Sequence, residues 1–143
     1  MSGYRKILLV VDLTEDSDLV GERAKAIAAC YGSRIHLLHV VEYVPVEPMG
    51  ETLLPAVQIE EELIERARQR LKDLAQRLNL TDSDCFVEAG SIKAEIIRVA
   101  EEQDVDLIVL GSRERHGLAI LLNFTEDTVL HSSPCDVLAV RLH

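Results

Sequence analysis

The sequence predicts an α/β fold, a three-layer, doubly wound, five-stranded parallel sheet with helices on both faces. Two observations predict it. Short aliphatic and β-branched runs, such as RKILLVV at residues 5–11, are nearly continuous, which is typical of strands covered on both faces. These runs alternate with segments of helical apolar spacing, as in a parallel sheet with crossover helices. The length of 143 residues predicts one domain, 1–143, with a substantial core.

The first half of the chain predicts two strands, one helix and a long loop. Residues 5–11 form the first strand, and residues 34–41 (RIHLLHVV) the second. The helix between them ends at Gly32, a typical C-cap. Its apolar positions are Leu19, Val20, Ala24, Ile27, Ala28 and Tyr31. Residues 42–55 contain three prolines and a glycine, so we expect an irregular loop there.

The middle of the chain predicts a long amphipathic helix, a short strand and a second helix. The long helix covers about residues 56–80 and has a strongly charged outer face. Its apolar stripe comprises Ile59, Leu63, Ala67, Leu71, Leu74, Ala75 and Leu78. Residues 85–88 form the strand, and the next helix starts at Gly90 and Ser91. The buried stripe of that helix comprises Ile92, Ile96, Ile97, Val99 and Ala100.

The last third predicts a strand at residues 106–110, a helix at 125–131 and a final strand at 136–142 after Pro134. The final strand is rich in Val and Leu, and at the edge of a sheet its backbone groups would lack partners. Pairing with a second copy across a two-fold axis would satisfy them, although an interior strand covered by a loop is an alternative. The predicted interface comprises Val137, Leu138, Ala139, Val140 and Arg141.

Composition excludes several classes of function. The net charge of −10 would repel a phosphate backbone, and with 3% aromatic residues few rings are present to stack on bases, so we expect no nucleic-acid binding. No apolar run approaches the roughly 20 residues that span a bilayer, and no signal-like segment precedes the first strand. We therefore expect a cytoplasmic protein that does not associate with membranes.

The three cysteines and five histidines predict neither a disulfide nor a metal site. Cys30, Cys85 and Cys135 are odd in number and lie in apolar surroundings, so we expect buried free thiols. His36 and His39 are three residues apart on a strand and would point to opposite faces. The chain has no nucleophile elbow, no GxxxxGK[ST] and no HExxH, so nothing indicates an enzyme.

Residues 105–125 predict a strand, a glycine, a polar loop and a helix, an order that usually forms an anion-binding cradle. Two side chains oppose that function. Glu114 places a carboxylate, and Phe124 a bulky ring, where a phosphate-holding loop favours small neutral residues. Arg113, Arg115 and His116 supply positive charge in the same loop.

The whole chain resembles the universal stress protein family of the UspA type. The resemblance rests on four segments in order, ILLVVDLTEDS, IHLLHVVE, EAGSIKAEIIRVAEEQDVDLIVLGSR and HSSPCDVLAVRL. It implies the adenine nucleotide alpha hydrolase-like version of the fold, a role in the stress response, and a homodimer formed through the last strand.

The nucleotide-binding branch of that family carries G-x2-G-x9-G-[ST], an aspartate after the first strand, and a backbone contact from the second strand to adenine. Aligned on this pattern, Gly111 and Thr125 match, Glu114 and Phe124 replace the two inner glycines, and Asp12 is the aspartate. The second-strand position falls near Val40.

We therefore expect a homodimeric interaction or signalling module without turnover or cofactor, whose partner protein is not specified by the sequence. The alternative is a sensor of ATP or AMP with Mg, in which Asp12 and Val40 hold adenine and Gly111, Arg113 and Thr125 hold phosphate. Asp12 could equally serve only to cap the following helix.

Overall fold

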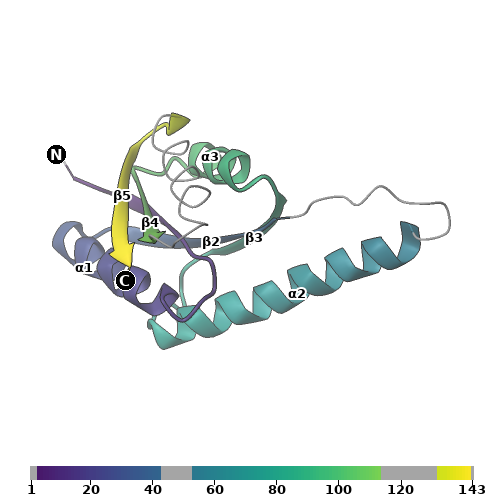
Figure 1. The fold of residues 1–143 in the computed structure, drawn as a ribbon. Helices are drawn as coiled ribbons and strands as arrows, with labels where there is room; N and C mark the ends of the chain where they lie inside the picture. Colours follow the sequence, from purple (N-terminus) through teal and green to yellow (C-terminus); the bar gives the residue numbers. More distant parts are fainter. Residues whose placement is uncertain (1–2, 43–52, 114–131, 143) are drawn as a thin grey trace.

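The computed structural model describes residues 3–42, 53–113 and 132–142. In these ranges the chain alternates between strands and helices, as Figure 1 shows. The elements are β1 (Lys6–Val10), α1 (Ser17–Tyr31), β2 (Arg34–Glu42), α2 (Leu53–Arg77), β3 (Cys85–Gly90), α3 (Ile92–Glu102), β4 (Leu107–Arg113) and β5 (Asp136–Leu142).

The five strands form one parallel sheet in the order β3-β2-β1-β4-β5. The central strand β1 pairs with β2 on one side, where Leu9 lies opposite Leu37, and with β4 on the other, where Leu9 lies opposite Val109. The chain runs outward from β1 through β2 to β3 and then crosses to β4, so the winding direction reverses between β1 and β4. This order confirms the predicted doubly wound sheet.

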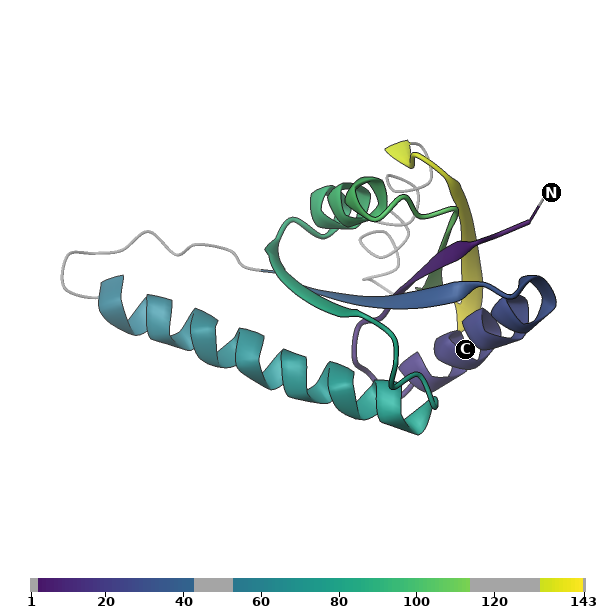
Figure 2. The ribbon, with the colours of Figure 1, turned by 180° about the vertical axis from the view of Figure 1, so that it is seen from behind.

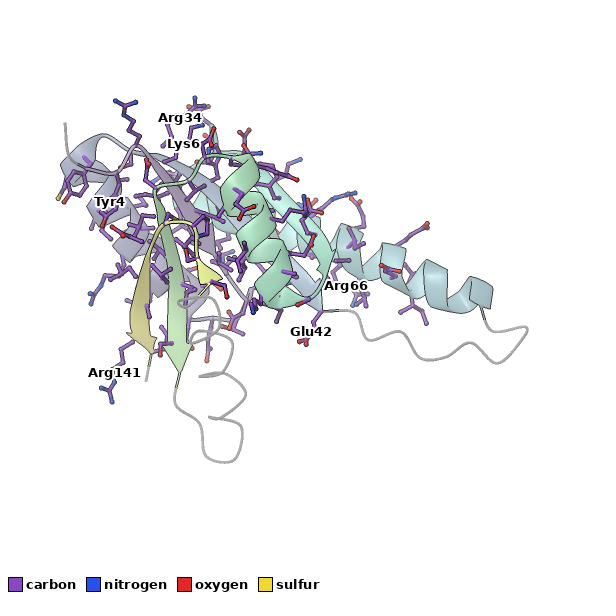
Figure 3. All side chains as sticks on the ribbon, turned by 90° about the horizontal axis from the view of Figure 1, so that it is seen from above. Tyr4, Lys6, Arg34, Glu42, Arg66 and Arg141 are labelled. Atoms are coloured by element: carbon purple, nitrogen blue, oxygen red, sulfur yellow. The ribbon has the colours of Figure 1, made fainter. Side chains whose placement is uncertain are left out.

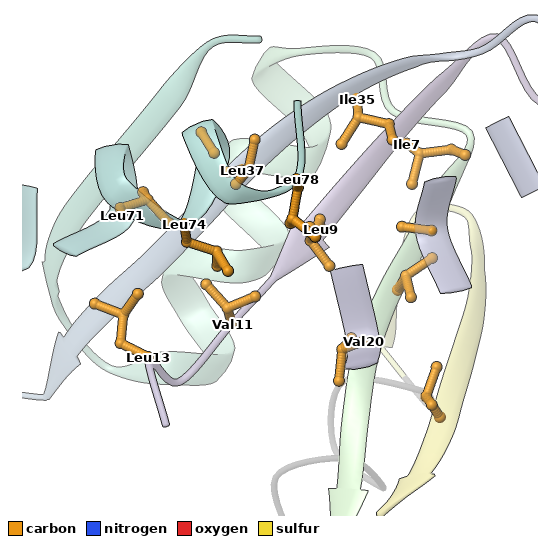
Figure 4. Close-up of a cluster of buried hydrophobic side chains, with 14 of the residues drawn as sticks. Ile7, Leu9, Val11, Leu13, Val20, Ile35, Leu37, Leu71, Leu74 and Leu78 are labelled. Carbon is orange, nitrogen blue, oxygen red and sulfur yellow. The ribbon is translucent and has the colours of Figure 1, made fainter. Parts of the chain in front are cut away.

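Helices cover both faces of the sheet, which confirms the predicted three layers (Figures 1 and 2). On one face, Leu9 and Leu37 pack with Leu71, Leu74 and other residues of α1 and α2 (Figure 4). On the opposite face, the strand residues Leu8, Leu38, Val40, Ile108 and Leu110 form a second buried cluster with Ile96, Val99 and Ala100 of α3 and with Val105. Alternate strand residues therefore belong to separate cores, as expected for strands buried on both faces.

Helix α1 ends where the sequence predicts it. Gly32 adopts a left-handed conformation with φ 67° and its amide bonds to the carbonyl of Ala28, a conformation that favours glycine. The predicted apolar stripe is only partly buried, because Leu19 and Tyr31 are exposed at its two ends. Val20 and Ala24, in the middle of the stripe, are buried.

Helix α2 begins earlier than predicted and buries only part of its stripe. It includes Pro55, which we had assigned to the irregular loop. Pro55 is the third residue of the helix, and proline is tolerated in the first turn because its missing amide would have no partner within the helix. The stripe is buried from Ala67 to Leu78, but Ile59 and Leu63 are 57% and 42% exposed.

Two other expectations need correction. Strand β4 continues through Gly111 to Arg113, beyond the predicted end at residue 110, because all three added residues pair with β5. The cysteines are free, but Cys30 on α1 and Cys85 on β3 are exposed, and Cys135 is only partly buried, where it packs against the core on the α3 face. The predicted helix at 125–131 and most of the predicted loop lie outside the described residues.

Among the described residues, no helix is long and apolar enough to cross a membrane.

Candidate functional site

A cavity of about 140 Å³ lies at the carboxyl ends of β1, β2 and β4. Val11 and Asp12 follow β1, Val40 comes from β2, and Gly111 comes from β4. The remaining wall is contributed by α1, α3 and β5, through Ser17, Val20, Ile92, Ile96 and Leu142. The cavity lies where the winding of the sheet reverses, between β1 and β4, and ligands of doubly wound sheets bind at such a point.

Asp12 organises the turn between β1 and α1. Its Oδ1 accepts hydrogen bonds from the Thr14 amide at 3.1 Å, the Thr14 hydroxyl at 2.7 Å and the Ser17 hydroxyl at 3.2 Å. The next residue, Leu13, has φ 61°, a left-handed conformation that is unusual for a branched side chain. Asp12 therefore stabilises the entry to α1 and also lines the cavity, so the two roles left open by the sequence do not exclude each other.

The second strand contributes Val40 and a residue that sequence reasoning missed, His39. Val40 is buried, and its neighbour His39 places Nδ1 at 2.8 Å from the carbonyl oxygen of Val11. Because a carbonyl can only accept, Nδ1 carries the proton and donates it to this bond. His39 thus ties the end of β1 to β2 at the cavity wall. The sequence signal for His39 was its position directly before Val40, which was already predicted to belong to the site.

Gly111 lies at the cavity as predicted, but for a different reason. A Cβ atom built on this residue would lie 2.7 Å from Leu142 Cδ1 and 3.2 Å from Val20 Cγ2. Gly111 is part of a regular strand, so the absent side chain makes room for β5 and α1 to pack against β4. Close packing, rather than a special backbone conformation, explains the glycine.

The described part of the site is mostly apolar. Asp12 is the only acidic residue among the described residues that line the cavity, and no Lys or Arg is among them. Val40, Ile96, Leu110 and Leu142 give the wall its apolar character. Among these lining residues, no Lys or Arg would offset the charge of a polyphosphate.

Of the predicted site residues, the structure brings together Asp12, Val40 and Gly111. Arg113 is the last residue of β4, and its side chain lies outside the described part. Glu114, Phe124 and Thr125 also lie outside the described residues. The apolar residues from α3 and β5 were not predicted as site residues, because the sequence indicated only that they are buried.

The opposite, amino end of the sheet contains a buried histidine. His36 is 5% exposed, and neither ring nitrogen forms a hydrogen bond among the described residues. Its Nδ1 lies 3.4 Å from Asp84 Oδ2, close enough for an electrostatic interaction but without hydrogen-bond geometry. Burial lowers the pKa of His36 below its usual value, and this outweighs the opposing effect of Asp84.

Comparison with known proteins identifies the family. The sequence model of the universal stress protein family matches residues 3–141. The chain belongs to this family. Universal stress protein A homolog 2 of Coxiella burnetii is 36% identical over 143 residues, which cover 99% of this chain and 98% of the relative.

Solved structures of universal stress proteins share the fold. UspA from Lactobacillus plantarum superposes with a TM-score of 0.76 at 22% identity, covering 99% of this chain and 100% of the other. A universal stress protein in complex with cAMP superposes with a TM-score of 0.64 at 21% identity, covering 97% and 98%. Together with the parallel sheet, these likenesses confirm the predicted adenine nucleotide alpha hydrolase-like fold.

In this universal stress protein, β5 is an edge strand. Among the described residues it pairs only with β4, so it lies at the edge of the described sheet, as predicted. Its side chains alternate in part between the core and the surface: Val140 and Leu142 are buried, Leu138 is 38% exposed, and Ala139 and Arg141 are exposed. No described strand pairs with the other side of its backbone.

Proposed function

We propose that this universal stress protein acts in the stress response as a homodimeric interaction or signalling module without catalytic turnover, and that it does not bind ATP tightly. Family membership supports the role in the stress response. The observation that carries the argument against tight ATP binding is the cavity at the carboxyl end of the sheet, whose described wall is mostly apolar, includes the Asp12 carboxylate and contains no Lys or Arg.

The loop after β4 strengthens the argument against ATP. A phosphate oxygen about 4 Å from the Glu114 carboxylate would experience a repulsion of roughly 4 kcal/mol at an effective dielectric constant of about 20. That energy corresponds to about three powers of ten in affinity. Phe124 adds bulk at a position where nucleotide-binding relatives have glycine.

A second function is favoured by one specific observation. Asp12, Val40 and Gly111, which the family resemblance assigns to nucleotide binding, line the same cavity. A universal stress protein of similar fold was solved in complex with cAMP. The alternative is therefore a sensor of an adenine nucleotide, ATP or AMP with Mg, that binds the base in this cavity.

A thermal-shift titration separates the two functions. We expect millimolar Mg-ATP or AMP to leave the melting temperature unchanged. If the protein bound either nucleotide with a micromolar Kd, the same concentration would raise the melting temperature by several degrees, because the ligand binds only the folded state. A clear rise with the wild-type protein would contradict the first proposal and support the nucleotide sensor.

A matched set of variants tests the reason for the weak binding. We expect the double variant Glu114→Gly with Phe124→Gly to gain a melting shift with Mg-ATP that the wild type lacks. Glu114→Gln serves as the control, because it removes the charge but keeps the size of the side chain. If the double variant gains no affinity, the two side chains do not explain the loss.

The homodimer is supported by the position of β5 at the edge of the sheet. Antiparallel pairing of two copies of β5 would continue the sheet and satisfy the backbone groups of both edges. Hydrogen exchange provides the test, because paired amides of β5 should become protected as the protein concentration rises. Exchange that does not depend on concentration, together with a monomeric mass in sedimentation, would contradict the dimer.

A further inference from the structure

Residues 59–65 of α2 present two apolar side chains, Ile59 and Leu63, that the described part of the chain leaves exposed. The helix extends well beyond the sheet, as Figures 1 and 2 both show. Ile59 and Leu63, one helical turn apart, are 57% and 42% exposed, while Leu71 and Leu74 in the other half are fully buried. The exposed residues continue the same stripe that contacts the sheet.

The charges along α2 are arranged unevenly. Residues 59–65 contain four glutamates and no basic residue, whereas residues 66–77 contain five basic residues and one aspartate. Several basic residues of the second part already have partners within the chain. Arg70 donates to the carbonyl of Leu13, Arg77 pairs with Asp18, and Arg68 pairs with Glu65.

Two charged side chains beside the exposed stripe, Glu62 and Arg66, have no such ion pair within the described part of the chain. Glu62 and Arg66 are both exposed, and they lie four residues apart, next to Leu63 on the helix surface. Neither forms an ion pair with the other or with any other described residue. Arg66 projects from α2 in Figure 3.

We propose that the N-terminal half of α2 binds the same segment of a second copy in antiparallel orientation. If a two-fold axis perpendicular to the two helices passes beside residue 64 of each copy, Glu62 of each copy lies opposite Arg66 of the other. The same axis brings Leu63 close to its own equivalent. One surface patch thereby meets itself, as a two-fold interface requires.

Charge decides between the two possible orientations. Parallel helices would place the four glutamates of one copy beside the four of the other, and like charges in contact weaken association. Antiparallel helices place each acidic part beside a basic residue. The same glutamates make the patch unsuitable for an anionic membrane surface, because the charges would repel.

This interface is distinct from pairing through β5, and its small apolar area indicates weak, concentration-dependent association. We would therefore measure it by sedimentation velocity in full-length protein that carries Leu138→Asp, a change intended to block pairing through β5. Over a wide range of concentration, the protein should shift from monomer to dimer. A monomer at every concentration would overturn the proposal while leaving the proposed function untouched.

Leu63→Glu tests the apolar contact. We expect it to lower the association constant by about tenfold or more, because the removed side chain would otherwise be buried in the pair. Leu19→Glu is the matched control, since Leu19 is also 42% exposed but lies on α1. Equal effects of the two substitutions would overturn the proposal.

Charge reversal tests the orientation. Glu62→Arg and Arg66→Glu should each weaken self-association, because each creates two pairs of like charges across the axis. An equimolar mixture of the two variants should associate again, since a mixed dimer has opposite charges at both positions. If the mixture associates no better than either variant alone, the antiparallel arrangement is wrong.

Discussion

The two ends of the parallel sheet differ in how they use polar groups. At the amino end, Asp106 Oδ2 accepts the backbone amides of Arg5 at 2.7 Å and Lys6 at 3.0 Å, and Lys6 Nζ donates to the carbonyl of Gln103. At the carboxyl end, Asp12 and His39 make hydrogen bonds around an open cavity. Figure 3 labels Lys6 and Arg34 at the amino end, and Glu42 and Arg141 at the carboxyl end.

This difference assigns stability mainly to the amino end of the sheet and ligand binding mainly to the carboxyl end. Polar side chains at the amino end bind the backbone of neighbouring elements, so their loss should mainly affect folding. At the carboxyl end, Asp12 and His39 form hydrogen bonds with turns that line the cavity, so their loss should mainly affect ligand binding. Such a division follows from the topology, because the reversal of winding between β1 and β4 opens a crevice at the carboxyl end of the sheet, where ligands of doubly wound sheets bind.

The largest effect on stability should come from Asp106→Ala. The substitution removes the acceptor for two backbone amides at the start of β1, and we expect a loss of about 2–3 kcal/mol in the free energy of unfolding. Urea denaturation measures it. Asp106→Asn, which keeps an acceptor oxygen, should lose less, and a loss below about 0.5 kcal/mol for Asp106→Ala would remove the contrast between the two ends.

Gly111→Ala should cause the second largest loss in the free energy of unfolding, and its added methyl group should also alter the wall of the cavity. The added methyl group collides with Leu142 and crowds Val20, so we expect a loss of about 1–3 kcal/mol. Gly32→Ala is the control at the other end of the sheet. It has open space around it, and its cost of about 1 kcal/mol should come from the left-handed backbone alone. A stabilising Gly111→Ala would show that Leu142 moves freely.

His36 should make stability depend on pH at the amino end. Its pKa is lowered in the folded protein, so below about pH 6.5 the unfolded chain binds more protons and stability falls as the pH decreases. We expect His36→Leu to flatten this slope and to add about 1 kcal/mol near pH 5, because it removes two buried ring nitrogens without hydrogen bonds. Denaturation curves at several pH values test it, and an unchanged slope would contradict the assignment.

The smallest effect on stability should come from Asp12→Asn. Asn keeps an acceptor for Thr14 and Ser17, so we expect a loss below about 0.5 kcal/mol. Any ligand-induced melting shift of the double-glycine variant should nevertheless fall, because Asp12 lines the cavity. If Asp12→Asn strongly lowered stability but left the ligand-induced melting shift unchanged, Asp12 would have a structural role like that of Asp106 at the amino end.

Much of the fold could be predicted because it depends on local pattern. The bounds of β5 agree with the prediction, since Pro134 and the run of Val and Leu define them locally. Gly32 also ends α1 as predicted. The exposure of Ile59 and Leu63 could not be predicted, because their spacing matches that of Leu71 and Leu74, and only the size of the sheet decides which of them it covers.

The candidate site divides in the same way. By themselves, the residues of this chain determined most of the strands and the turn after β1, because each depends on neighbouring residues. Only the tertiary structure decided that Ile96 and Leu142 complete the wall around Asp12, that Gly111 makes room for β5 and α1, and that Ile59 and Leu63 are exposed. The physical reason is that cavities and exposed surfaces depend on the distances between elements, which no local periodicity encodes.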